Sequence, residues 1–94
     1  MMNNEEAISV LAQEMERYRA KPYADLIQLL DETKYIDITG PSGTPYQVEL
    51  SVVWDDKSKG ELRIIGAVDD GGWRAFAPLT DSFIMRPDGT FVGE

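Results

Sequence analysis

The first third of the chain has apolar residues at helical spacing. They recur every three or four positions, at Ile8, Leu11, Met15 and Tyr18. Asn3 followed by Glu6 matches a capping box, so the helix is predicted to begin after Asn3. Pro22 should interrupt it, because the residue before a proline disfavours the α conformation. A second short helix is then predicted through Tyr23, Leu26, Ile27 and Leu30, ending near Asp31 or Glu32.

From residue 34 onward the pattern changes to alternation, which is typical of β-strands. Strands are predicted over 34–39, 46–54 and 61–68, separated by loops rich in glycine, proline and aspartate. The strand 46–54 is the clearest of them. Its apolar residues, Tyr46, Val48, Leu50, Val52 and Trp54, alternate with Gln47, Glu49, Ser51 and Val53.

The dipeptide Asp70-Gly71 is the signal of a two-residue type I′ hairpin turn. Such a turn fixes the register and predicts a fourth strand over Trp73–Pro78. The expected pairs are Val68 with Trp73, Gly66 with Ala75, and Ile64 with Ala77. A further hairpin is expected to join 83–86 to 90–92 through the turn Pro87-Asp88-Gly89.

These elements predict one α+β domain over residues 1–94. Two N-terminal helices are expected to pack on one face of a four- or five-stranded antiparallel meander, because connections this short do not allow parallel crossovers. The final segment, 79–94, has two possible places. It either adds strands at the edge of the sheet or folds over the face that the helices leave open.

The two faces of the predicted sheet suggest different roles. On the covered face, Gly66 beside Ala75 and Ala77 leaves a shallow trough. A closely packed helix, the rings of Trp54 and Trp73 as part of the core, or a small ligand could fill it. The opposite face carries an apolar row of Val53, Ile65 and Phe76, which Ile84 could join, with Arg63, Arg74 and Glu49 around it. Apolar patches rimmed by charge mark contact sites. The row therefore predicts a contact surface, with a second copy of the chain as the favoured partner.

A second interaction hypothesis concerns one end of the sheet. The loops 40–45, 69–72 and 87–89 are predicted to meet there, with Trp73, Arg74 and Arg86 close behind them. Aromatic rings and arginines on glycine-rich turns are enriched in interaction sites. Pairing of these arginines with neighbouring aspartates is the alternative interpretation.

The composition excludes most familiar catalytic sites. The 94 residues contain no cysteine and no histidine, which removes thiolate chemistry, the usual general base and the commonest metal ligand. The acidic pairs Asp55-Asp56 and Asp69-Asp70 do not fit the spacing of a calcium loop. We therefore expect no enzyme activity, no metal and no cofactor.

The charge balance narrows the choice of partner. Seventeen acidic against nine basic residues give a net charge of −8, which disfavours nucleic acid and anionic membranes. The N-terminus is acidic where a secretory signal would be basic, so a cytoplasmic location is expected. The sequence thus predicts a non-catalytic protein-interaction module. The alternatives are an acidic inhibitor or immunity-type protein that shields a basic surface, and a small-ligand binder between helices and sheet.

Overall fold

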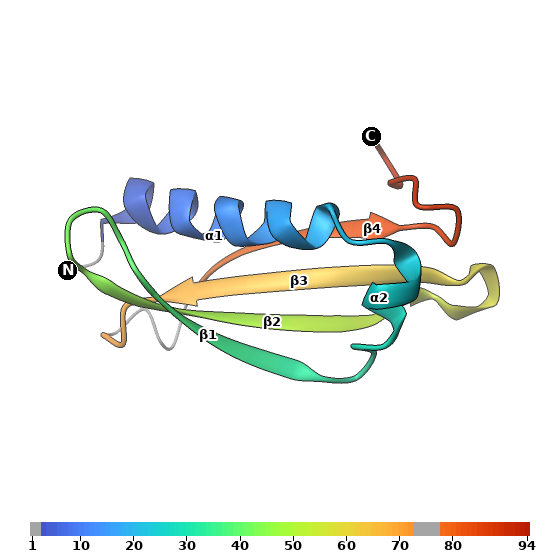
Figure 1. The fold of residues 1–94 in the computed structure, drawn as a ribbon, viewed down its shortest axis with the longest axis horizontal. Helices are drawn as coiled ribbons and strands as arrows, with labels where there is room; N and C mark the ends of the chain where they lie inside the picture. The colour runs from blue at the N-terminus through green and yellow to red at the C-terminus, as the bar shows by residue number, and fades with distance from the viewer. Residues whose placement is uncertain (1–2, 73–77) are drawn as a thin grey trace.

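The computed structural model describes residues 3–72 and 78–94 of the chain. Within these residues it contains two α-helices and one antiparallel sheet of four strands in the order β1-β2-β3-β4 (Figure 1). The elements are α1 (Asn4–Arg19), α2 (Tyr23–Ile27), β1 (Thr33–Thr39), β2 (Pro45–Asp56), the short 3₁₀ helix η1 (Lys57–Lys59), β3 (Glu61–Asp69) and β4 (Leu79–Met85). The predicted α+β class is confirmed.

The first helix begins as the capping pattern predicts and lies against β3 and β4. The Asn3 side chain accepts a hydrogen bond from the Glu6 N–H, at 3.1 Å. A Cβ added to Gly66 of β3 would lie 2.6 Å from Met15 Sδ and 2.8 Å from Leu11 Cδ1. The trough predicted at Gly66 is therefore filled by α1, because only a residue without a side chain lets the helix come this close.

The second helix is shorter than predicted. It ends at Ile27, and a turn over Gln28 and Leu29 follows in place of further helix. Leu30 forms an isolated parallel bridge with Val52, and the Asp31 N–H donates to the Val52 carbonyl at 2.9 Å. Asp31 itself has a left-handed φ of 63°, which no helix tolerates.

The predicted partner of β3 is wrong. Val68 pairs with Leu79, Gly66 with Asp81 and Ile64 with Phe83, so β4 is the segment 79–85. The residues predicted to pair with β3, Trp73, Ala75 and Ala77, lie outside the described residues.

The local reason lies in the turn residues. A type I′ turn needs positive φ at both central positions, and Gly71 has one whereas Asp70 does not. The Asp69 and Asp70 carboxylates instead accept the N–H groups of Gly71 and Gly72, at 2.8 and 2.9 Å. Aspartate therefore shapes a wider connection here than a two-residue hairpin.

The wider reason is packing. The segment 79–85 places Phe83 and Met85 in the core, where they are 4% and 1% exposed. The register through Trp73–Pro78 would have put Ala77 opposite Ile64, where Phe83 lies, and would have ended before Leu62, the partner of Met85. A phenylalanine and a methionine bury much more surface than the methyl group of one alanine, which favours the observed strand.

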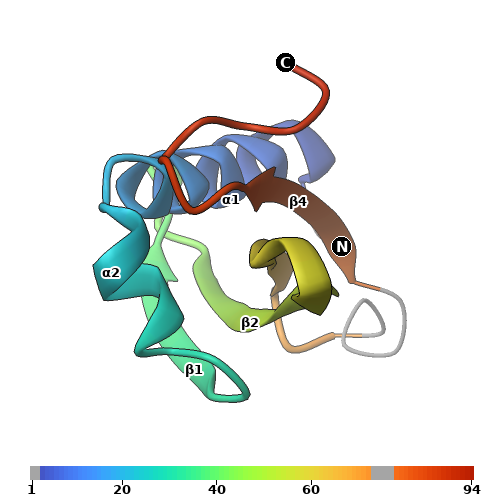
Figure 2. The same ribbon diagram turned by 90° about the vertical axis from the view of Figure 1, so that its right-hand side faces the viewer.

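The C-terminal segment turns back toward α1. The Arg86 N–H donates to the Thr90 carbonyl at 2.8 Å, so the predicted turn at 87–89 is present. The expected hairpin is reduced to an isolated bridge between Met85, the last residue of β4, and Phe91. The Phe91 ring packs edge-on against Phe83 at 5.6 Å. The segment thus lies on the helix side of β4 and does not fold over the other face of the sheet (Figure 2).

Candidate functional site

We define the outer face as the face of the sheet opposite α1. Strand alternation and the pairing register place there Tyr35 and Asp37 of β1, Gln47, Glu49, Ser51 and Val53 of β2, Arg63, Ile65, Ala67 and Asp69 of β3, and Thr80, Ser82 and Ile84 of β4. All four strands contribute to this face. The alternate residues of the same strands, which point toward α1, supply the strand residues of the core.

The apolar residues of the outer face form a diagonal pattern. Arg63 lies between Val53 and Ile84 in the register, and the next row places Ile65 between two serines. The straight row expected from the sequence is therefore broken, because Val53 and Ile65 are diagonal neighbours. Both are half-buried, as are Ala67 and Ile84. Phe76, the third member of the predicted row, lies outside the described residues.

Arg63, one of the residues predicted to surround the apolar row, forms an ion pair within the chain. The Arg63 guanidinium donates to Asp55 Oδ1 from Nη2 at 2.7 Å and from Nε at 3.0 Å. Its Nη1 also reaches Ser82 Oγ at 3.4 Å. These contacts fix the Arg63 head group, and its stem lies between Val53 and Ile84 in the register and adds to the apolar surface.

Among the described residues of the outer face, Tyr35 is the most exposed large apolar side chain, and it is not among the contact residues predicted from the sequence. Tyr35 of β1 lies opposite Glu49 and is 64% exposed. The signal was the alternation of the short strand, in which Tyr35 points away from Ile36 and Ile38. Tyrosine is among the residues most enriched in protein contacts, because it buries a large rigid surface at little entropic cost.

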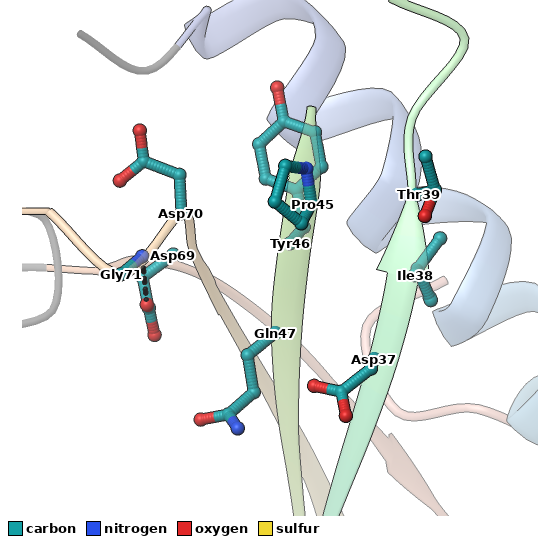
Figure 3. Close-up of a pocket in the computed structure, with 9 residues that line it drawn as sticks. All are labelled: Asp37, Ile38, Thr39, Pro45, Tyr46, Gln47, Asp69, Asp70 and Gly71. Atoms are coloured by element: carbon teal, nitrogen blue, oxygen red, sulfur yellow. Dashed lines mark hydrogen bonds between the residues drawn. The ribbon is translucent and has the colours of Figure 1, made fainter. Parts of the chain in front are cut away.

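An acidic cavity of about 310 Å³ lies at one end of the sheet (Figure 3). Gln47 pairs with Asp37 on one side and with Asp69 on the other, so two carboxylates flank an amide across three strands. The other lining residues are Ile38, Thr39, Pro45, Tyr46, Asp70 and Gly71. Carboxylates grouped around an amide suit a cationic side chain. In residues 3–72 and 78–94 no group of three acidic side chains is placed to hold a metal ion.

A polar cluster beside this cavity fixes the start of α1. The Glu6 carboxylate accepts from the Tyr46 hydroxyl at 2.7 Å, and from Ser42 Oγ and N–H at 2.6 and 2.9 Å. The hydrogen bonds from Ser42 and Tyr46 lower the pKa of Glu6. Burial, together with the Glu6 carboxylate, raises the pKa of Tyr46 to about 12. The cluster holds α1 to the loop between β1 and β2.

The predicted cluster of three loops does not form. The loops 40–45 and 69–72 share one end of the sheet, but β4 carries the chain to the opposite end before the turn at 87–89. Pro87 accordingly lies beside Gly60, in the turn between β2 and β3. Arg86 donates to the Phe91 carbonyl at 3.1 Å, within its own turn. Trp73 and Arg74, the other predicted members, lie outside the described residues.

Comparison with protein-family models, curated proteins and solved structures finds no match for the chain. Over the residues that the structure describes, neither helix has the length and apolar character required to cross a membrane.

Proposed function

We propose that the chain is a non-catalytic protein-interaction module of the cytoplasm that contacts its partner through the outer face of its sheet. The observation that carries this proposal is the apolar content of that face. Val53, Ile65 and Ile84 stand there together with the 64% exposed ring of Tyr35. A sheet face exposed to solvent usually carries polar residues, so apolar side chains spread over all four strands favour contact with another protein.

The composition of the face indicates the chemistry of the partner. Tyr35 and Ile65 lie in the middle of the sheet and Val53 and Ile84 toward η1, whereas Asp37, Asp69 and Asp70 lie at the opposite end. A matching partner has an apolar patch bordered on one side by lysine or arginine. Apolar contact then supplies the affinity, and the acidic end fixes the orientation.

The test is capture of binding proteins from the native cytoplasm with Ile65→Lys and the matched variant Gln13→Lys. Gln13 is exposed on α1, so its variant adds the same charge on the other side of the molecule. Proteins retained by the wild type and by Gln13→Lys should be lost with Ile65→Lys, while all three chains keep the same circular dichroism spectrum. Equal capture by both variants would contradict the proposal.

The acidic cavity supports a second candidate, an inhibitor that covers a basic surface. Salt separates the two, because exposed charges are screened over ~10 Å at 0.1 M salt whereas apolar contact is not. Binding that falls steeply with salt and is lost in the double variant Asp37→Asn, Asp69→Asn would favour the inhibitor. Binding that varies little with salt supports the outer face as the main contact.

A further inference from the structure

The two edges of the sheet are finished differently. The β4 edge is partly covered, because Phe91 bridges Met85 and the Val92 N–H donates to the Ile84 carbonyl at 2.9 Å. The β1 edge has no such cover among the described residues. Its seven residues contain no proline, and their pairing with β2 runs without a bulge. A proline and a bulge are two of the features by which natural sheets block an open edge, and β1 has neither.

The hydrogen-bonding pattern identifies the free backbone groups of this edge. The Gly40 N–H donates to the Thr44 carbonyl at 2.8 Å, which makes these two residues a hydrogen-bonded pair. Hydrogen-bonded pairs alternate along an antiparallel ladder, so Ile38, Ile36 and Lys34 also direct their N–H and carbonyl groups toward β2. The residues between them must direct theirs outward. These residues are Thr33, Tyr35, Asp37 and Thr39.

Apolar side chains of β1 are incompletely covered on both faces of the sheet. Ile36 and Ile38 lie on the helix side and are only half-buried, although they pack against the core. Tyr35 is 64% exposed on the outer face. An added strand would cover apolar side chains on both faces of the sheet at once.

We propose that the β1 edges of two copies of this chain pair antiparallel about a two-fold axis at Ile36, which joins the two sheets into one of eight strands. This register overlaps all seven residues and places Thr33 opposite Thr39 and Tyr35 opposite Asp37 of the other copy. Every outward N–H and carbonyl group then has a partner. Ile36 meets its own equivalent at a non-hydrogen-bonded position, where facing side chains come closest.

Two opposite-charge contacts favour a second copy over an unrelated strand, and they outnumber the one like-charge contact of this register, between the two Asp37 side chains, which are diagonal neighbours on the outer face. Lys34 has no ion pair among the described residues, and in this register it lies opposite Ile38 of the other copy, with Gly40 two residues beyond Ile38 on the same side of that chain. A Cβ on Gly40 would lie 2.8 Å from Glu6 Cδ, so the Glu6 carboxylate stands on the helix side of this edge. Lys34 of each copy is therefore within reach of Glu6 of the other, given that diagonal neighbours are about 7–8 Å apart.

This inference concerns a different surface from the outer face and does not depend on the proposed partner. Its test is sedimentation equilibrium from about 10 µM to about 1 mM, the range in which a small interface is measurable. Tyr35→Pro removes an outward N–H and breaks no bond to β2, whereas Tyr35→Thr keeps that N–H. The proline variant should weaken the dimer at least about tenfold, and the threonine variant should remain a dimer in this range.

Lys34→Glu, with Lys57→Glu as its matched control on η1, tests the charge contact. We expect Lys34→Glu to weaken the dimer by about fivefold more than its control. Ile65→Lys should leave the edge dimer intact. A wild type that is monomeric throughout the range overturns the proposal. A dimer that survives Tyr35→Pro also overturns the proposal. If Ile65→Lys dissociates that surviving dimer, the outer face is the contact between the two copies.

If Tyr35→Pro does not fold, amide hydrogen exchange of the wild type tests the edge dimer instead. In the wild type, the amides of Tyr35 and Asp37 should gain protection as the concentration rises. Amides of these two residues that exchange equally fast at all concentrations rule out the edge dimer.

Discussion

The two faces of β3 show how differently one strand can be used. Leu62, Ile64 and Val68, on the face toward α1, are 0% exposed. Their neighbours on the outer face are all half-buried. The inner face has a fixed shape, because α1 packs directly against the backbone at Gly66. The outer face has the same strand geometry without a covering element among the described residues. We infer that stability depends mainly on the first face and binding on the second.

The largest difference should appear between two adjacent isoleucines. Ile64→Ala empties a fully buried position and should cost about 2–5 kcal/mol of unfolding free energy. Ile65→Ala removes the same atoms from a half-buried position and should cost less than about 1.5 kcal/mol. Urea denaturation of both variants measures the difference. Equal costs would mean that the outer face is packed like the core.

The second largest effect should come from steric overlap at Gly66 and not from lost contacts. Gly66→Val must displace Met15 and Leu11, and should destabilise the protein by about 1–3 kcal/mol. Ala67→Val, one residue further on, adds two methyl groups on the outer face and should be nearly neutral. Met15→Ala should partly rescue Gly66→Val, because it opens the space that valine needs. A rescue that fails would place the strain elsewhere.

The smallest effect concerns the pH dependence of stability. Since the folded state lowers the pKa of Glu6 below its ordinary 4.5, its contribution is complete above that value and is lost as the pH falls through the folded pKa. The pKa of Tyr46 is raised from 10.0 to about 12, so its contribution is present below pH 10 and is lost as the pH rises toward about 12.

Tyr46→Phe should therefore reduce the loss of stability in acid and abolish the tyrosine-dependent loss in alkali. Tyr35→Phe, which removes a hydroxyl from the outer face, is the matched control and should leave both limits unchanged. Urea midpoints measured from about pH 3 to about pH 11 compare the two variants with the wild type. An identical profile for Tyr46→Phe would show that its hydroxyl does not support Glu6.

Local patterns predicted the elements whose signals are local. The cap at Asn3, the strands β1 to β3 and the placement of Val53, Arg63 and Ile65 on one face all follow from spacing and alternation, and the structure has them. That Arg63 lies between Val53 and Ile84 depends also on the pairing register of β2, β3 and β4.

The fourth strand could not be predicted in this way. Asp70-Gly71 signals a tight hairpin and equally allows a wider turn, and alternating apolar residues occur both in 73–78 and in 79–85. The choice depends on which segment fills the space under α1, where Phe83 and Met85 are buried. The prediction had one strand over 73–78 and another over 83–86, whereas among the described residues the structure has a single strand, over 79–85. The extra reversal of the chain placed Arg86 at the wrong end of the sheet. The contact between Glu6 and Tyr46 spans 40 residues and has no local signal.

The contacts of α1 also bear on the order in which the protein folds. A helix of 16 residues is marginal in water, so α1 needs the sheet to persist. Its first turn is held by Ser42 and Tyr46, and its last turn by Glu94, which accepts from Arg19 at 2.7 Å. Neither anchor exists until distant parts of the chain have come together. We expect the β1–β2 and β2–β3 hairpins to form in the transition state and α1 to dock late, so substitutions in α1 should mainly accelerate unfolding.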